Sequence, residues 1–220
     1  MAHERILMRY GTLVFDCDGV IMDSNRVKSE AFHRIAQPWG ERAASVLLEY
    51  HRAHGGISRH VKLRHFLEHI AQAPSDDEHL DILLQRYAKA VRNGLLTCAI
   101  APGLGALRAR TADARWMVVS GGLETELRSV FAERNIAHLF DGGIFGSPAD
   151  KDMILTRERA HGNLTMPAVF LGDSRYDHDA ARRAGLDFVF VSGWTEMEDW
   201  RAFVADYRLR AIDNIAQLEQ

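Results

Sequence analysis

Four short apolar runs stand out along the chain, and each ends in small or acidic residues. They are Thr12–Phe15, Trp116–Val119, Ala168–Leu171 and Phe188–Val191. The runs are rich in Val and Phe and nearly continuous in apolar residues, which is typical of strands buried on both faces of a parallel sheet. A weaker run at Gly143–Phe145 predicts a further strand.

Apolar residues at helical spacing lie between these runs. The helices predicted in this part of the chain are Gly103–Ala112, Glu124–Glu133, Lys151–Ala160 and Arg175–Ala184. The last of them follows two capping candidates, Asp173 and Ser174, and ends before Gly185, a residue suited to a helix C-terminus. Strand–helix alternation from about residue 97 onward therefore predicts an open α/β sheet with right-handed crossovers.

The stretch from about Ser24 to Leu95 breaks this alternation, because it contains no convincing strand. Its amphipathic patterns predict helices at Ala31–Gln37, Arg42–Ala53, His60–Ile70 and Glu78–Arg92. A length of roughly 70 residues is too great for an ordinary connection between two elements. We therefore expect a small helical domain, residues 24–95, inserted after the first strand of a core formed by residues 1–23 and 96–220.

Composition narrows the functional classes. The 220 residues are 47% hydrophobic and 26% charged, as in an ordinary globular protein, and the net charge of −3 gives no indication of nucleic-acid binding. The two cysteines, Cys17 and Cys98, fit a reducing compartment. No apolar run approaches the ~20 residues of a membrane helix, and Met1–Tyr10 is too charged for a signal peptide. We therefore expect a cytoplasmic protein with no membrane or nucleic-acid partner; nothing in the sequence indicates an oligomeric state.

Acidic residues gather where predicted strands end, the edge at which open α/β sheets bind ligands. Asp16 and Asp18 follow the first strand, and an extended backbone would place both on one side. Asp173 ends another strand, and Asp177 follows four residues later. Converging carboxylates repel one another, so they favour a divalent cation, and an all-oxygen ligand set favours Mg²⁺ over zinc.

Two further residues suit an anionic ligand at the same edge. Ser120 and the backbone N–H groups after it lie where a strand meets a helix, a natural site for an anion. Lys151 begins a helix, where its ammonium group gains nothing from the helix dipole. This position suggests that Lys151 has a role other than stabilising the helix.

These residues resemble a known family. Asp16-Cys17-Asp18-Gly19-Val20, Ser120, Lys151 and Gly172-Asp173-Ser174-x-x-Asp177 are similar to the four ordered motifs of the haloacid dehalogenase superfamily, and together they span most of the chain. The helical insert resembles the cap of the subgroup that includes phosphoglycolate phosphatases and β-phosphoglucomutases. The resemblance implies a Rossmann-like parallel-sheet core with an all-helical cap.

The resemblance also implies roles for the motif residues. Asp16 would attack phosphorus and form an aspartyl-phosphate, and Asp18 would protonate the leaving oxygen and then activate water. Ser120, with the adjacent backbone N–H groups at Gly121, would bind the phosphoryl oxygens, and Lys151 would neutralise charge. Mg²⁺ would be held by these metal ligands: Asp16, the backbone carbonyl of Asp18, Asp173 and Asp177.

The cap carries a weaker resemblance. Gly55-Gly56-Ile57-Ser58-Arg59 is similar to a cap segment of β-phosphoglucomutase-like proteins, in which an arginine reaches the non-transferring end of the substrate. Arg59 would then bind a second phosphate or a carboxylate, and Lys62 lies one turn further on. Ser24, Asn25 and Lys28 lie near the expected hinge and substrate entrance. Those mutases typically have a histidine where Lys28 stands, which argues against mutase activity.

The prediction is a Mg²⁺-dependent phosphatase that acts on a small phosphorylated metabolite, either a sugar phosphate or a phosphoglycolate-like acid. Dehalogenases and phosphonate-cleaving members lack an acid at the position of Asp18, so neither activity is expected. A phosphomutase is the alternative. A catalytically idle binding protein on the same fold is a remote one, and the filled motif positions give it no support.

For several of these residues, a purely structural role is the alternative to the functional role given above. Asp16 and Asp18 could cap a turn, Asp173 could be a helix N-cap, and Asp177 could pair with Arg175 or Arg182. Arg59, Lys28 and Lys62 could be surface residues.

Six of the 11 histidines lie between His51 and His79. The pairs His51/His54 and His65/His69 could each share a helix face, but we expect solvated positions rather than a metal site. Alternation should turn Cys17 into the core.

Overall fold

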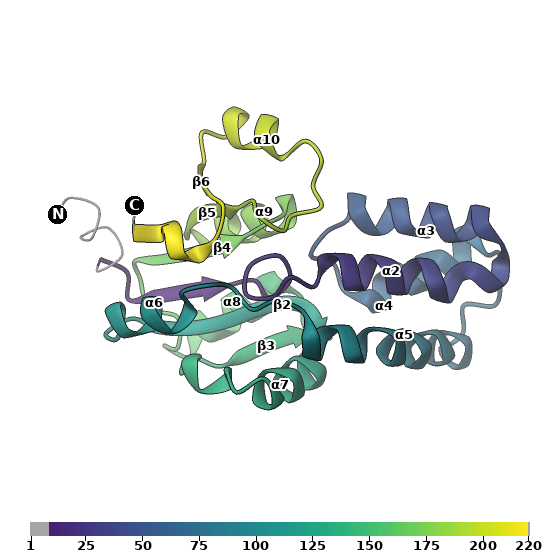
Figure 1. The fold of residues 1–220 in the computed structure, drawn as a ribbon, viewed down its shortest axis with the longest axis horizontal. Helices are drawn as coiled ribbons and strands as arrows, with labels where there is room; N and C mark the ends of the chain where they lie inside the picture. The colour runs from purple at the N-terminus through teal and green to yellow at the C-terminus, as the bar shows by residue number, and fades with distance from the viewer. Residues whose placement is uncertain (1–8, 220) are drawn as a thin grey trace.

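The computed structural model describes residues 9–219 and contains one six-stranded sheet (Figure 1). The strands are β1 (Thr12–Phe15), β2 (Arg115–Leu123), β3 (Ile144–Ser147), β4 (Ala168–Gly172), β5 (Asp187–Val191) and β6 (Arg210–Ile212). Their spatial order is β3-β2-β1-β4-β5-β6, and every neighbouring pair is parallel. The expected open parallel sheet is confirmed. Residues 1–8, on which part of the signal-peptide prediction rests, lie outside the described residues.

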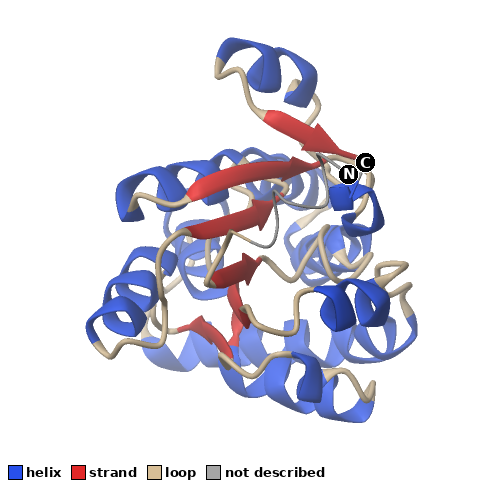
Figure 2. Ribbon diagram, turned by 90° about the vertical axis from the view of Figure 1, so that its left-hand side faces the viewer, coloured by secondary structure: helices blue, strands red, loops and turns tan. Residues whose placement is uncertain are grey.

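Helices cover both faces of this sheet (Figure 2). Those of the sheet region are α6 (Leu104–Arg110), α7 (Glu124–Glu133), α8 (Lys151–Ala160), α9 (Arg175–Ala184) and α10 (Trp200–Asp206). Strand alternation divides the core: Leu13 and Phe15 belong to the same apolar cluster as α6 and α7, whereas Val14 packs in the cluster that contains α8 and α9. Burial on both faces explains why the strand sequences are apolar throughout.

A helical insert follows β1 and lies to one side of the sheet (Figure 1). It consists of α2 (Asn25–Ala36), α3 (Glu41–Ala53), α4 (Arg59–His65), the π-helical turn Phe66–Ile70 and α5 (Asp77–Thr97). No strand occurs in residues 24–97, all of which the structure describes. The two segments that join the insert to the sheet run side by side, since the Asp23 backbone N–H donates to the Ala99 carbonyl at 2.9 Å. The predicted fold class, a parallel sheet with an inserted helical cap, is confirmed.

Some elements differ from the sequence prediction. The single helix predicted at His60–Ile70 is α4 followed by the π turn, in which the Ala71 N–H donates to the Phe66 carbonyl. Strand β6 and helix α10 were not predicted: β6 has three residues with one buried apolar side chain, and α10 begins without a side-chain cap. Short 3₁₀ segments complete the fold at Gln37–Trp39, Ala137–Leu139 and Ile215–Glu219. Among residues 9–219, no helix is long and apolar enough to cross a membrane.

Strand order determines where a ligand can bind. From β1 the chain builds the sheet first toward β2 and β3, and then on the other side of β1 toward β4, β5 and β6. Ligands of open α/β sheets bind beyond the carboxyl ends of the strands at such a reversal. The residues that directly follow β1 and β4 therefore occupy the expected place for a site.

Candidate active site

The carboxylates of the first and last motifs meet at this edge. Asp16 directly follows β1, and its N–H donates to the Leu171 carbonyl in β4 at 2.9 Å. Asp173 directly follows β4, and both Asp16 and Asp173 are buried. Ser120 lies within β2 on the other side of β1 and is also buried. Three strands thus bring three of the predicted residues to one edge of the sheet.

A capping box at the start of α9 positions Asp173. Ser174 is the N-cap: its hydroxyl accepts from the Asp177 N–H at 3.2 Å, and the Asp177 carboxylate accepts from the N–H groups of Ser174 and Asp173 at 3.1 and 3.2 Å. Asp173 is therefore not the helix cap, and its carboxylate takes no part in capping α9. Asp177 does not pair with Arg175, which forms an ion pair with Asp199.

Lys151 joins two of the carboxylates. Its Nζ lies 2.9 Å from Asp16 Oδ1 and forms an ion pair with Asp177 Oδ1, and its side chain is fully buried. Burial alone would lower the pKa of Lys151, but the two carboxylates outweigh burial and raise it. The ammonium group is therefore held charged beside Asp16.

The three acidic side chains fit a divalent cation. One carboxylate oxygen each from Asp16, Asp173 and Asp177 lies within 4.8 Å of the others. Asp16 Oδ1 is buried beside the Lys151 ammonium. Burial raises the pKa of Asp16 to about 7 despite Lys151, and burial with Asp177 and Asp16 nearby raises the pKa of Asp173 well above its usual value. Crowded carboxylate oxygens of this kind are ligands for a hard cation such as Mg²⁺.

Gly19 leaves room for the Asp173 carboxylate. Its φ is +76°, and a Cβ at this position would lie 2.1 Å from Asp173 Oδ2. The loop after Asp18 can therefore pass beside the acidic cluster only with glycine at position 19.

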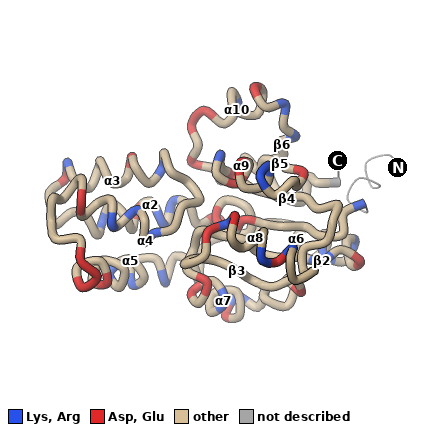
Figure 3. The backbone as a smooth tube through the Cα atoms, turned by 180° about the vertical axis from the view of Figure 1, so that it is seen from behind, with Lys and Arg blue, Asp and Glu red and all other residues tan. Residues whose placement is uncertain are grey.

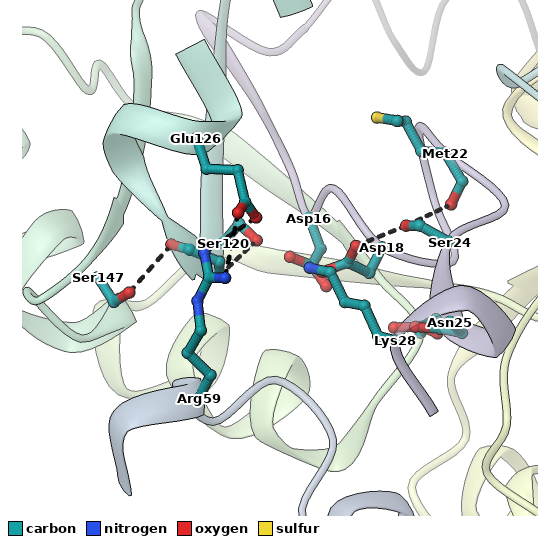
Figure 4. A network of polar contacts seen from close by, with 12 residues as sticks. Asp16, Asp18, Met22, Ser24, Asn25, Lys28, Arg59, Ser120, Glu126 and Ser147 are labelled. Atoms are coloured by element: carbon teal, nitrogen blue, oxygen red, sulfur yellow. Dashed lines mark hydrogen bonds and ion pairs between the residues drawn. The ribbon is translucent and has the colours of Figure 1, made fainter. Parts of the chain in front are cut away.

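Asp18 is held by the start of α2 (Figure 4). The Ser24 hydroxyl donates to its Oδ1 at 2.5 Å, and Lys28 forms an ion pair with its Oδ2. Burial would raise the pKa of Asp18, but Lys28 and Ser24 outweigh it and lower the pKa. Asn25 lies beside them and donates to Asp173 Oδ2 at 2.7 Å and to the Trp194 carbonyl at 2.9 Å.

The helical insert closes directly on β2. Ser120 Oγ accepts from the Gly122 N–H at 3.1 Å, and Gly121 packs against the insert. A Cβ on Gly121 would lie 2.1 Å from the Gly56 carbonyl oxygen. Only a residue without a side chain allows this approach, so Gly121 marks a backbone contact between the insert and the sheet.

The two predicted cap cations have different partners. Arg59 in α4 meets Glu126 in α7: Nη2 lies 2.9 Å from Oε1, and Nη1 donates to Oε2 at 3.1 Å (Figure 4). Lys62 Nζ donates to His51 Nδ1 at 2.8 Å and contacts the His51 carbonyl at 3.3 Å. Arg59, Lys62 and Lys28 are all buried rather than on the surface.

One cavity of about 640 Å³ lies between the sheet edge and the insert. The predicted site residues that line it are Asp16, Asp18, Asn25, Lys28, Arg59, Lys62, Gly121 and Asp173. Ser24, Ser120, Lys151 and Asp177 lie behind these and contact the site through the bonds described above. Sequence reasoning missed Glu126 and His51, because a glutamate in a first helical turn and a histidine on a helix give no distinctive signal.

Three other histidines of the insert form an aromatic stack with Tyr50. The Tyr50 ring lies 4.1 Å from the His54 ring and 3.9 Å from the His65 ring, and His65 and His69 are 4.6 Å apart. Within residues 9–219, the acidic triad is the only side-chain group with metal-binding spacing, so these histidines form no such cluster. Cys17 is buried in the core, as alternation suggested.

Comparison with solved structures supports the fold. The β-phosphoglucomutase of Clostridium difficile is 18% identical, with a TM-score of 0.70 and coverage of 95% of this chain and 93% of that one. CbbY from Rhodobacter sphaeroides, solved in complex with phosphate, is 18% identical, with a TM-score of 0.69 and coverage of 95% and 96%. A phosphoglycolate phosphatase, so predicted, from Haemophilus somnus is 18% identical, with a TM-score of 0.66 and coverage of 83% and 85%.

The family comparison is more specific. No curated protein matches the chain. The model of the haloacid dehalogenase-like hydrolases matches residues 10–185, which include β1, the helical insert and the carboxylates after β4. The motif resemblance is thereby confirmed, and the chain belongs to the haloacid dehalogenase-like hydrolase family.

Proposed function

We propose that the protein is a Mg²⁺-dependent phosphatase for a small phosphorylated metabolite and acts through an aspartyl-phosphate. The observation that carries this proposal is Asp16: a buried carboxylate that lines the cavity, with the Lys151 ammonium 2.9 Å from its Oδ1. A carboxylate so placed is a nucleophile whose charge is offset by a fixed cation.

In the first step an Asp16 oxygen attacks phosphorus, and the bond from phosphorus to the ester oxygen breaks. Asp18 gives its proton to the departing oxygen. In the second step Asp18 takes a proton from water, whose oxygen attacks the same phosphorus. The bond from phosphorus to Asp16 then breaks, which releases inorganic phosphate and restores both carboxyl groups.

Asp18 is ionised in the free site, since Lys28 and Ser24 lower its pKa. This state suits the second step, in which Asp18 accepts a proton. Its protonation for the first step has to accompany substrate binding, because the phosphoryl charge raises the pKa of a nearby carboxyl group.

The remaining residues stabilise charge. Lys151 would offset charge on Asp16 and on the phosphoryl oxygens, and Ser120 with the Gly121 N–H would hold those oxygens. We propose Asp16, Asp173, Asp177 and the Asp18 carbonyl as the Mg²⁺ ligands. When bound, Mg²⁺ would supply further charge neutralisation for the phosphoryl group.

We also propose that residues 24–95 act as a cap on a core of residues 1–23 and 96–220. The close contact of Gly56 with Gly121 and the Arg59–Glu126 ion pair support a closed arrangement over the cavity. Closure of this kind excludes bulk water during phosphoryl transfer.

The test is phosphate release from a panel of phosphorylated metabolites and p-nitrophenyl phosphate, with and without Mg²⁺. We expect Mg²⁺-dependent release of phosphate, with one small substrate strongly preferred. Isomerised phosphoesters formed without phosphate release would instead indicate the phosphomutase alternative. No turnover of any compound in the presence of Mg²⁺ would contradict both.

A further inference from the structure

The loop between β5 and α10, residues 192–199, contacts both the acidic cluster and the helical insert. The Thr195 hydroxyl donates to the Asp173 backbone carbonyl at 2.7 Å and accepts from the Met197 N–H at 3.1 Å. A hydroxyl has a single donor, so these two bonds fix its orientation. The loop therefore helps to hold the backbone of Asp173, whose carboxylate belongs to the acidic cluster.

The next residue, Glu196, binds the insert. Its Oε2 accepts from the Ser29 hydroxyl in α2, and its Oε1 lies 3.8 Å from Arg52 Nη2 in α3. Ser29 is only 2% exposed, whereas the Arg52 side chain is 47% exposed. A hydrogen bond from a buried hydroxyl to a carboxylate is a stronger contact than a long, exposed ion pair. Ser29 is therefore the main partner of Glu196.

The insert reaches the same loop at a second point. Asn25, the first residue of α2, donates to the Trp194 carbonyl at 2.9 Å and to Asp173 Oδ2 at 2.7 Å. Residues 194, 195 and 196 thus bind the insert, the sheet edge and the insert in turn. Adjacent residues are joined by a rigid peptide unit with Cα atoms about 3.8 Å apart, so the insert cannot move Glu196 without also moving Thr195.

This contact lies across the sheet from the Arg59–Glu126 pair. Glu126 follows β2 and Glu196 follows β5, and these strands lie on either side of β1 and β4, where the acidic cluster is built. Movement of the insert away from the sheet would break both contacts. Loss of the contact at Glu196 would also release the loop that holds Asp173.

We propose that Glu196 and Thr195 are positioning residues that couple the closed insert to the acidic cluster: Glu196 binds the insert when it is closed, and Thr195 then holds Asp173 in place. This inference rests on the proposed function, because it takes the insert to be a cap and the acidic cluster to bind Mg²⁺. Neither residue touches the substrate in this account.

Three variants test the coupling, with p-nitrophenyl phosphate as the substrate. Glu196→Ala removes both contacts with the insert, Glu196→Gln keeps an oxygen that can accept from Ser29, and Thr195→Val keeps the shape of the side chain without its hydroxyl. We expect Glu196→Ala and Thr195→Val each to lower kcat about 5- to 10-fold, the effect of one lost hydrogen bond, with a smaller change in KM. Glu196→Gln should retain most of the native kcat. The double variant should lose no more than the more severe single variant, because both residues act through Asp173.

Thermal melting with Mg²⁺ or EDTA gives a second measurement that needs no turnover. Loss of a purely structural contact would lower Tm equally in both conditions, whereas a misplaced Asp173 should also reduce the rise in Tm that Mg²⁺ produces. Asp206→Ala is the matched control, because Asp206 is an exposed carboxylate at the end of α10. This variant should keep the native kcat and the native effect of Mg²⁺.

An unchanged kcat or an unchanged effect of Mg²⁺ in folded Glu196→Ala or Thr195→Val would overturn the coupling proposal and leave the phosphatase proposal intact. Losses that multiply in the double variant would do the same, since the two residues would then act independently. If Glu196→Ala does not fold, Thr195→Val decides. If the native protein releases no phosphate, the phosphatase proposal fails and the effect of Mg²⁺ on Tm alone decides the coupling; absence of that effect in the native protein as well would overturn both.

Discussion

At the scale of residues, the site depends on one aspartate with two tasks. Asp177 binds the backbone N–H groups of Asp173 and Ser174 through one oxygen and Lys151 through the other. It therefore fixes the turn that presents Asp173 and also the lysine that lies beside Asp16. Helix capping and charge placement, which are usually separate functions of a side chain, are combined here in a single carboxylate.

Gly121 allows a test of the contact between the insert and the sheet. In Gly121→Ala the new Cβ would meet the Gly56 carbonyl oxygen at 2.1 Å, so the backbones must separate. We expect kcat/KM to fall about 10- to 100-fold, because misplacement of a binding group by about 1 Å can cost this much. Steady-state hydrolysis of the preferred substrate measures the effect.

Gly105→Ala is the control for this change. Gly105 is exposed in α6, and a Cβ there meets nothing within 4 Å. This variant should keep native kcat/KM and gain up to about 1 kcal/mol of stability from helix propensity. Native activity in Gly121→Ala would show that the close contact with Gly56 does not matter for function.

At the scale of elements, the Arg59–Glu126 pair connects the insert to the sheet region through α4 and α7. We expect a double-mutant cycle with Arg59→Met and Glu126→Gln to give a coupling energy of about 1–3 kcal/mol in chemical unfolding, because the two groups are in direct buried contact. Strictly additive effects of the two substitutions would mean that the pair does not hold these helices together.

The elements that the sequence predicts well are those with local start and stop signals. Helices α8 and α9 have the predicted limits, since Asp150 and Ser174 cap their first turns and Gly185 follows the last turn of α9. Helix α2 starts at Asn25, six residues before the predicted Ala31. Its first turns bury polar residues such as Lys28 toward the site, so an apolar pattern cannot reveal them.

The residues of the candidate site also fall into those that the sequence could locate and those that it could not. Asp16, Asp173 and Lys151 could be located from sequence, because each follows a strand or begins a helix whose place in a parallel sheet is fixed. Ser120 was expected at the end of its strand but lies within β2, which continues to Leu123. The partners could not: Glu126 meets Arg59 across 67 residues, and His51 receives Lys62 from another helix of the insert. Such pairs depend on how helices pack together, and no local spacing encodes this.

At the scale of the whole molecule, the positions of the charged residues say more about the protein than its net charge. Acidic and basic positions are interspersed over both the sheet region and the insert (Figure 3), and the net charge is −3. At the site, however, burial raises the pKa of Asp16 and of Asp173, so ionising them opposes folding in the absence of a cation. We therefore expect the stability of the protein to depend on pH and on a bound cation.

We expect Mg²⁺ to stabilise the protein more at pH 8 than at pH 5.5. The pKa of Asp16 is about 7 in the folded protein and ordinary in the unfolded chain, so the unfolded chain binds fewer protons between pH 4 and 7 and metal-free stability falls as the pH rises through this range. Protons also compete with Mg²⁺ for the same oxygens. Thermal melting with Mg²⁺ or EDTA at both pH values measures this effect.

The shift in Tm should be roughly 5–10 °C at pH 8 with Mg²⁺ at about 100 times its Kd, and smaller at pH 5.5. Thermal melting with Ca²⁺ and with Zn²⁺ serves as the control that shows whether the site prefers Mg²⁺ to other divalent cations. An equal shift at both pH values, or none at millimolar Mg²⁺, would contradict a metal site built from these carboxylates.

The central claim is that Asp16 is the nucleophile, and hydrolysis of p-nitrophenyl phosphate by Asp16→Asn tests it most directly. Asparagine keeps the size of the side chain and removes a buried charge, so the variant should melt no lower than the native protein in EDTA. We expect the rate to fall at least about 1,000-fold. Turnover within tenfold of the native enzyme, by a variant shown to be folded, would contradict the account.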